Sequence, residues 1–116
     1  NPRFKGLLDI SLETDCDPIL RPMQVHHIVA ITQEALSNTL RHAHARHAKI
    51  AVRQENGAIA VIVEDDGRGM PADANSSGYG LRSMRDRAHL LGGKLEIESP
   101  PNKGMRVRLT VPEENS

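Results

Sequence analysis

Two polar side chains set four residues apart are the first candidates for chemistry in this chain. Glu34 and Asn38 would share one face of a helix, and Arg41 and His42 would continue that face. A carboxylate and an amide oxygen are ligands that suit Mg²⁺, and a guanidinium pairs with phosphate oxygens. The spacing therefore suits a metal–phosphate site, and an ordinary solvated helix face is the alternative.

A second candidate is the loop Asp65–Gly69, which directly follows an expected strand. Gly67 and Gly69 allow a sharp turn and a close approach of the backbone to a flat ligand. Asp65, at the end of the strand, could accept a hydrogen bond from a buried donor such as the exocyclic amine of a purine. The alternative is an ordinary Asp-Gly turn.

A third candidate is the segment Gly78–Leu81, which opens an expected helix. The first N–H groups of a helix bind phosphate, and Gly78 and Gly80 would clear the approach to them. The chain contains no Walker-type P-loop sequence, and the strand–helix context of a dinucleotide-binding fingerprint is missing. A glycine-rich linker would also account for these residues.

We expect these candidates to be positioned by a two-layer α/β sandwich, in which helices cover one face of a mixed sheet. Alternating apolar residues predict strands, apolar residues at helical spacing predict helices, and Asn56–Gly57 predicts a tight hairpin turn. The expected strands are Leu7–Glu13, Ala48–Glu55, Ala58–Asp65, Lys94–Ser99 and Met105–Val111; the expected helices are Pro22–Ala45 and Leu81 to the glycine stop at Gly92–Gly93; and Pro71–Gly80 is expected to be a flexible flap.

Apolar residues also predict which side of each element is buried. The alternation of Leu8, Ile10 and Leu12 predicts a half-buried first strand. The second helix is expected to bury Leu81, Met84, Ala88 and Leu91. In the first helix the stripe expected to face the sheet consists of Val25, Ile28, Val29, Thr32, Ala35, Leu36, Thr39 and Leu40.

Length and composition narrow the possible functions. With 116 residues, 38% of them hydrophobic, the chain corresponds to one packed domain. Fifteen basic residues balance fifteen acidic ones, so the overall positive field of a nucleic-acid binder is missing. Phe4 and Tyr79 are the only aromatic residues, so the aromatic surface on which single-strand binders stack bases is missing. Cys16 is the single cysteine and cannot form an intrachain disulfide. No stretch is long and apolar enough to span a membrane, and the start at Asn-Pro suggests a piece of a longer protein.

Taken together and in this order, Glu34 to Asn38, Asp65 to Gly69 and Gly78 to Leu81 resemble the N, G1 and G2 boxes of the ATP-binding catalytic domain of sensor histidine kinases. That domain has the Bergerat fold of the GHKL group, which includes DNA gyrase B, a heat-shock chaperone and MutL-type ATPases. The resemblance extends from Arg21 to Pro112. The sequence EALSNTLRHAHA, the short flap and the region from Gly78 to Ser99 are similar to the nitrate/nitrite-sensor type, whose partners are NarL-type response regulators.

The resemblance implies Mg²⁺ and ATP as ligands and assigns a role to each candidate residue. Asn38 would coordinate the Mg²⁺ that bridges the phosphates, and Glu34 would be the catalytic residue, as a polarising group or general base. The remaining implied nucleotide contacts are Arg41 near the phosphates, His42 in the pocket lining, Asp65 at the adenine amine, Gly67 and Gly69 in the pocket wall, and Gly78, Gly80 and Leu81 at the flap hinge with backbone N–H groups for the phosphates.

The resemblance also implies what lies outside this chain. In the family the γ-phosphoryl group goes to a histidine on a separate dimerisation domain. None of the six histidines here has that sequence context, so we expect this piece to bind ATP without phosphorylating itself. We expect it to be monomeric, whereas the whole protein would be a homodimer, anchored in the bacterial inner membrane with this domain in the cytoplasm.

One departure from the family pattern concerns the last hairpin. The family often has Gly-Thr where this chain has Gly104–Met105, and a thioether cannot donate the hydrogen bond of the threonine hydroxyl. This substitution predicts weaker or differently hydrated adenine binding, and not its loss.

Several alternatives stay open from the sequence. The same fold serves kinases of anti-sigma type, ATPase clamps and non-catalytic nucleotide binders. His42, His44 and His47 could contribute to a transition-metal site, although surface histidines near a helix end are the plainer reading. The basic run Arg41–Arg53 could dock an acidic partner or could simply be a solvated surface.

Overall fold

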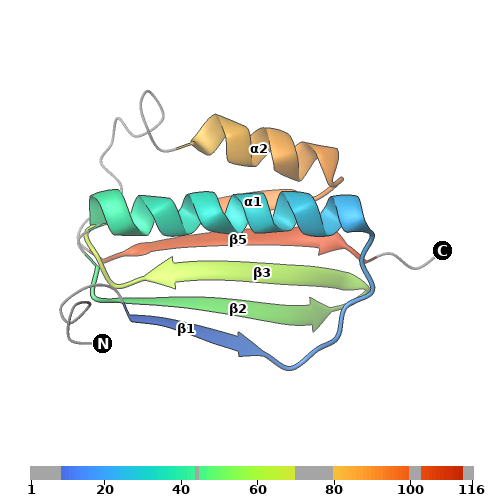
Figure 1. Ribbon diagram of the computed structural model, residues 1–116, viewed down its shortest axis with the longest axis horizontal. Coiled ribbons are helices and arrows are strands. Elements are labelled where there is room, and N and C mark those ends of the chain that lie inside the picture. The colour runs from blue at the N-terminus through green and yellow to red at the C-terminus, as the bar shows by residue number, and fades with distance from the viewer. Residues whose placement is uncertain (1–8, 44, 70–79, 100–102, 114–116) are drawn as a thin grey trace.

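A computed structural model describes residues 9–43, 45–69, 80–99 and 103–113 of the chain. Five strands form one sheet in the order β1-β2-β3-β5-β4. Figure 1 shows β1, β2, β3 and β5 side by side in this order. β1 runs parallel to β2, and the other neighbouring pairs are antiparallel, so the sheet is mixed. In chain order the elements are β1 (Asp9–Thr14), α1 (Pro22–Asn38), the π-helical turn η2 (Thr39–Ala43), β2 (His47–Glu55), β3 (Ala58–Asp65), α2 (Leu81–Leu90), β4 (Lys94–Glu98) and β5 (Met105–Pro112).

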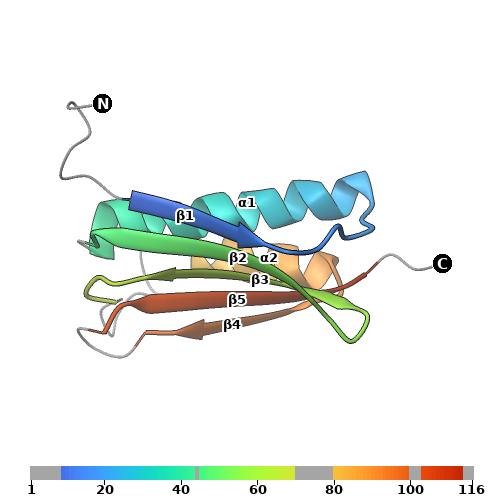
Figure 2. The ribbon, with the colours of Figure 1, turned by 90° about the horizontal axis from the view of Figure 1, so that it is seen from below.

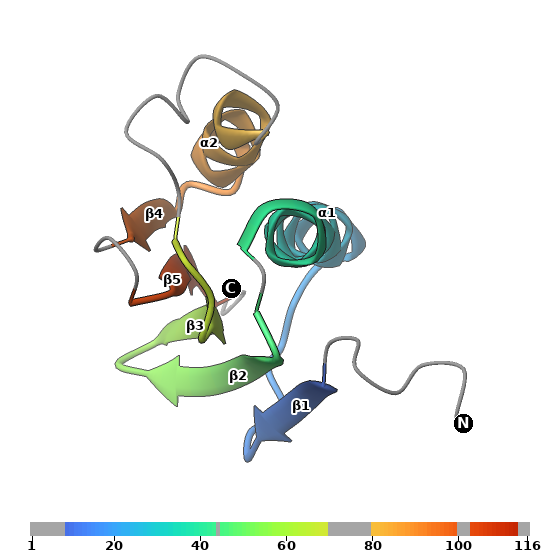
Figure 3. The same ribbon diagram turned by 90° about the vertical axis from the view of Figure 1, so that its left-hand side faces the viewer.

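Both α-helices lie against the same face of the sheet, as views from its edge and its end show (Figure 2 and Figure 3). α1 packs on β3 and α2, and α2 also packs on β4. The expected two-layer α/β sandwich with a mixed sheet is confirmed. The core between the layers consists of Ile31, Ala35, Ile59, Val61, Val63, Leu81, Met84, Ala88, Leu91, Met105, Val107, Leu109 and Val111.

Local turn chemistry fixes where several elements begin and end. Asn56 and Gly57 have φ values of 50° and 79°, as the tight hairpin turn between β2 and β3 requires. After α2, Gly92 has a φ of 65°, and the N–H of Gly93 donates to the carbonyl of Ala88 at 2.9 Å, which closes the helix. Both turn predictions are confirmed.

The start of α1 is tied to the end of the sheet by a buried glutamine. The N–H of Arg21 donates to Oε1 of Gln24 at 2.7 Å, which is half of a capping box. Nε2 of Gln24 donates to the carbonyl of Pro112 at 3.1 Å. One side chain therefore caps the helix and links it to β5.

The stripe predicted for the first helix is only partly correct. Ala35 is buried, but Val25 and Val29 are 45% and 46% exposed. The buried residues of α1 are Gln24, Ile31, Ala35 and Asn38, which repeat at roughly helical spacing on another side. The buried side of α1 is the one that faces β3 and α2, and two polar residues lie on it.

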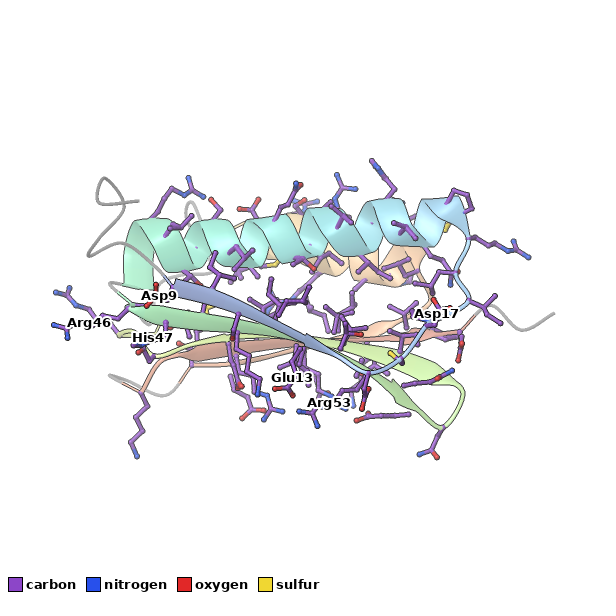
Figure 4. The ribbon with its side chains drawn as sticks, turned by 60° about the horizontal axis from the view of Figure 1, so that its bottom comes forward. Asp9, Glu13, Asp17, Arg46, His47 and Arg53 are labelled. Carbon is purple, nitrogen blue, oxygen red and sulfur yellow. The ribbon has the colours of Figure 1, made fainter. Side chains whose placement is uncertain are left out.

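Strand β1 is exposed along its whole length, so the prediction of a half-buried first strand is wrong. β1 is the edge strand of the sheet, and α1 is centred on β3. Charged side chains join it to its neighbour, because Glu13 lies 3.2 Å from both Lys49 and Arg53 of β2 (Figure 4). These pairs are largely solvated, so each contributes on the order of 1 kcal/mol or less.

The first helix does not continue as an α-helix to Ala45. α1 ends at Asn38 and is followed by the π-helical turn η2. Oγ1 of Thr39 lies 3.2 Å from the carbonyl oxygen of Ala35, four residues back on the helix. Among the described residues, no helix is long and apolar enough to cross a membrane.

Leu109→Ala should lower the free energy of unfolding by about 2–5 kcal/mol, because it leaves a cavity in the core. Leu109 is 1% exposed, whereas Leu90 on α2 is 61% exposed. Leu90→Ala removes the same atoms and should change the free energy of unfolding by less than about 0.5 kcal/mol. Urea denaturation followed by circular dichroism measures both, and equal losses would contradict the assigned core.

Candidate nucleotide-binding site

The first two sequence candidates meet where α1 and β3 end. Asn38 is the last residue of α1 and is 2% exposed. The next residue, Thr39, is also buried, and its hydroxyl donates to Oδ2 of Asp65 at 2.9 Å. Asn38 is therefore the sequence neighbour of a residue that is hydrogen-bonded to the end of β3.

The carboxylate of Asp65 is held on both of its oxygens. Oδ1 accepts the N–H of Gly67 at 2.8 Å, which forms an Asx-type turn, and Oδ2 accepts the hydroxyl of Thr39. Each oxygen of a carboxylate has a second lone-pair site, so capacity for a ligand donor remains. Gly69, buried with a φ of 79°, lies further along the same loop. The backbone of Asp65 is equally confined, because a Cβ at Gly104 would collide with its carbonyl oxygen.

A second carboxylate, Asp66, fastens this loop to the start of β2. Oδ1 accepts the N–H groups of Arg46 at 2.8 Å and of His47 at 2.9 Å, and Oδ2 lies 2.9 Å from Nδ1 of His47. These hydrogen bonds, first the backbone N–H of His47, lower the pKa of Asp66 to about 2. Nε2 of His47 also lies 3.8 Å from Asp9, so β1, β2 and the loop converge at one end of the sheet (Figure 4).

The third sequence candidate reaches the first through Gly80. Gly80 precedes α2 in a left-handed conformation, with a φ of 65°, and a Cβ there would collide with the side chain of Glu34. Glu34 also lies 3.6 Å from the guanidinium of Arg41, in a partly exposed ion pair. The predicted catalytic carboxylate, the basic residue beside it and the start of α2 are therefore brought together.

The beginning of α2 has no side-chain cap, so an anion could bind to its backbone. Gly80 is the N-cap and supplies no side-chain hydrogen bond to the first turn. The side chain of Leu81 is buried in the core, so its contribution to a ligand would come from its N–H group. Unsatisfied N–H groups at a helix start attract phosphate oxygens.

A hollow of about 280 Å³ lies between α1 and α2. It is lined by Ala30, Gln33, Glu34, Ser37, Ser83, Met84 and Arg87. Glu34 therefore borders this hollow as well as Gly80.

Two of the predicted site residues are not placed by the structure. Gly78 lies outside the described residues, and so does the side chain of His42, although its backbone belongs to η2. The transition-metal alternative is not tested, because His44 and the side chain of His42 lie outside the described residues; among the described side chains, no group of three or more His, Cys, Asp or Glu could hold a metal ion.

Sequence reasoning missed the two residues that hold the loop. The pattern places Thr39 in an apolar stripe, although it is buried with its hydroxyl on a carboxylate. Asp66 has no assigned role, although it binds the start of β2. Two acidic residues directly after a buried strand are a signal that could have identified Asp66, since the second carboxylate needs partners of its own.

The family described as "Histidine kinase-, DNA gyrase B-, and HSP90-like ATPase" matches residues 23–115 of this chain. The chain belongs to this family. The match includes every site residue predicted from the sequence, from Glu34 to Leu81. The predicted resemblance to the GHKL group is confirmed at this level.

Among curated relatives, the sensor histidine kinase LiaS of Bacillus subtilis is 38% identical over 111 residues, which cover 95% of this chain and 31% of LiaS. The sensor protein VraS of Staphylococcus epidermidis is 36% identical over 94 residues, which cover 78% of this chain and 27% of VraS. The chain therefore spans less than a third of the length of these relatives. Their similarity leaves the nitrate/nitrite-sensor type a prediction.

Solved structures agree with the fold. The histidine kinase domain of the blue-light activated histidine kinase EL346 from Erythrobacter litoralis superposes with a TM-score of 0.81 at 26% identity, covering 93% of this chain and 52% of that one. The ATP binding domain of PrrB from Mycobacterium tuberculosis gives a TM-score of 0.75 at 21% identity, covering 98% and 85%. The chain is thus similar to domains of histidine kinases in sequence and in architecture.

Asp66→Asn should lower the free energy of unfolding at neutral pH, and this free energy should then fall less steeply as the pH is lowered. The folded-state pKa of Asp66 lies below the usual 3.8, so its stabilising contribution is present above about pH 4 and is lost as the pH falls towards 2. The free energy of unfolding, measured by urea denaturation between pH 2 and 7, tests this. Asp15→Asn, in the exposed loop before α1, is the control; the same acid dependence in the Asp66 variant and the parent would contradict the assignment.

Proposed function

We propose that this chain is the Mg²⁺- and ATP-binding catalytic domain of a sensor histidine kinase, which transfers the γ-phosphoryl group of ATP to a histidine on a separate dimerisation domain. The observation that supports it best is the convergence of the three motifs. The Thr39 hydroxyl links the end of α1 to Asp65, and Gly80 packs on Glu34. In this proposal the adenine would lie at the Asp65 end of these contacts and the phosphates at the Gly80 end.

At the adenine end, Asp65 would accept the exocyclic N–H of the base. Its carboxylate is fixed by two hydrogen bonds, and it lies at the start of a loop in which glycines remove side-chain bulk. Gly104 lets the following hairpin approach the Asp65 backbone. The residues present therefore suit a flat, amine-bearing base.

At the phosphate end, the donor set fits Mg²⁺. The amide oxygen of Asn38 and the nearby carboxylate of Glu34 are hard oxygen ligands, and Mg²⁺ commonly combines one or two protein oxygens with phosphate oxygens and waters. When bound, Mg²⁺ supplies charge neutralisation on the phosphates. Asn38 would hold it, while the N–H groups at the start of α2 and Arg41 would bind phosphate oxygens.

Glu34 would act on the acceptor. Its carboxylate is partly exposed and borders the hollow between α1 and α2, so an imidazole can approach it from solvent. By accepting a hydrogen bond from one ring N–H, a carboxylate makes the other ring nitrogen a better nucleophile and stabilises the charge that develops on the ring. Phosphoryl transfer then depends mainly on positioning and charge neutralisation.

The proposal extends to the protein of which this chain would be part. We propose a membrane-anchored homodimeric sensor with this domain in the cytoplasm, on the model of sensor kinases that are several times longer than this chain. A NarL-type response regulator would then take the phosphoryl group. That choice rests on the similarity of EALSNTLRHAHA and of the helix after the flap to the nitrate/nitrite-sensor type.

Calorimetric titration of the chain with ADP and a non-hydrolysable ATP analogue, with and without Mg²⁺, tests the pocket. Asp65→Asn should weaken binding about tenfold or more, because the new amide presents a donor where the base requires an acceptor. Asn38→Ala should abolish the enhancement by Mg²⁺. Asp15→Asn should bind like the parent chain.

Circular dichroism must show that each variant is folded, since Asn38 is buried. A folded parent chain that binds no adenine nucleotide at millimolar concentration would overturn the proposal. A folded Asn38→Ala variant that keeps the full effect of Mg²⁺ would overturn the role of Asn38.

Gly80→Ala should weaken binding of the ATP analogue several-fold, because the added methyl group displaces Glu34 and strains a backbone with a φ of 65°. Gly57→Ala is the matched control. Gly57 also has a positive φ, but a Cβ added there, in the turn between β2 and β3, would meet open space. Comparable loss of affinity in both variants, measured by calorimetry, would show that strain alone, and not the contact with Glu34, is responsible.

A further inference from the structure

The neighbours of Asp65 within the sheet cannot orient its carboxylate. In the register of the sheet, Asp65 lies opposite Ala48 on β2 and opposite Met105 on β5. Directly opposed residues project from the same face with Cβ atoms roughly 4.5–5.5 Å apart, so these are the side chains best placed to reach it. A methyl group and a thioether donate no hydrogen bond.

A hydroxyl group of the helical layer, that of Thr39, supplies the hydrogen-bond donor that Asp65 lacks within the sheet. Oγ1 of Thr39 lies 2.9 Å from Oδ2 of Asp65 and 3.2 Å from the carbonyl oxygen of Ala35. The hydroxyl has one proton and two acceptors to choose from. The carboxylate is the nearer and the charged acceptor, so it takes the stronger hydrogen bond.

We propose that Thr39 is a positioning residue that sets the preference of the site for adenine. Its hydroxyl on Oδ2, together with the Gly67 N–H on Oδ1, fixes the plane of the carboxylate so that one of its two remaining lone pairs faces the exocyclic amine of the base. The inference rests on the proposed function. A hypoxanthine base carries a carbonyl oxygen in place of that amine, which the fixed carboxylate repels.

The test compares binding of ADP and IDP by calorimetry in the chain and in Thr39→Val, which removes the hydroxyl and keeps the shape. ADP should bind about threefold to tenfold more weakly, the effect of roughly one hydrogen bond. Affinity for IDP should change less than twofold, so the ratio of the two affinities should shrink. Thr39→Ser should restore that ratio.

Thr32→Val is the matched control. The hydroxyl of Thr32 donates to the carbonyl of Ile28 at 2.9 Å, four residues back on the same helix, as the Thr39 hydroxyl could to Ala35. Losing such a bond alone should leave the ADP to IDP ratio unchanged. Met105→Thr should raise ADP affinity more in the Thr39→Val background than in the parent chain, because a hydroxyl across the sheet would then supply the donor that Asp65 lacks.

An unchanged ADP to IDP ratio in a folded Thr39→Val variant would overturn this inference, and the proposed function would stand if Asp65→Asn still weakened ADP binding. A folded parent chain that binds neither nucleotide would overturn both. Should Thr39→Val fail to fold, Thr39→Ala removes the same hydroxyl at the cost of a small void, and the same ratio decides.

Discussion

The packing of α1 on β3 is the contact on which the site depends. Residues 59–63 of β3 are buried on both faces of the sheet, which makes this strand the fixed reference for everything around it. α1 runs over β3 and ends at the same end of the molecule, with η2 beyond it (Figure 1). The last residue of α1 is Asn38 and the last residue of β3 is Asp65. They are linked through Thr39, which follows Asn38 and donates its hydroxyl hydrogen bond to Asp65. The candidate site lies there because a helix of this length ends where the strand beneath it ends.

Around that junction, the loop after β3 is held from three directions. Its own backbone holds Asp65 through Gly67, η2 holds it through Thr39, and the start of β2 holds Asp66. A glycine-bearing loop would otherwise sample many conformations, and ordering it on binding would oppose affinity. In the folded protein these contacts already hold Asp65 and Asp66 in place. Such fixed polar groups are what electrostatic preorganisation of the proposed site requires.

The sequence was informative wherever the determining interactions are local. The Asn56–Gly57 turn, the Gly92–Gly93 helix end and the order of strands and helices could all be predicted, because turn chemistry and short-range periodicity decide them. The exposed β1 and the shifted buried side of α1 depend on which strand a helix covers, and that is decided by packing between segments far apart in the chain. Thr39 combines both difficulties. A threonine suits an apolar stripe equally well, and only the fold shows that a carboxylate lies beside it.

The π-helical turn η2 bears on how this chain is aligned with others. A π-helical turn carries a residue more than an α-helical turn over the same rise, because its hydrogen bonds reach one residue further. Removing one residue between Thr39 and Ala43 would leave an ordinary α-helical turn, with Asn38 before it and β2 after it still in place. Homologous domains can therefore differ by a single-residue gap directly after this asparagine. An alignment that forbids the gap would put Arg41 and the residues after it, the loop Asp65–Gly69 included, out of register, although Glu34 to Asn38 still matched.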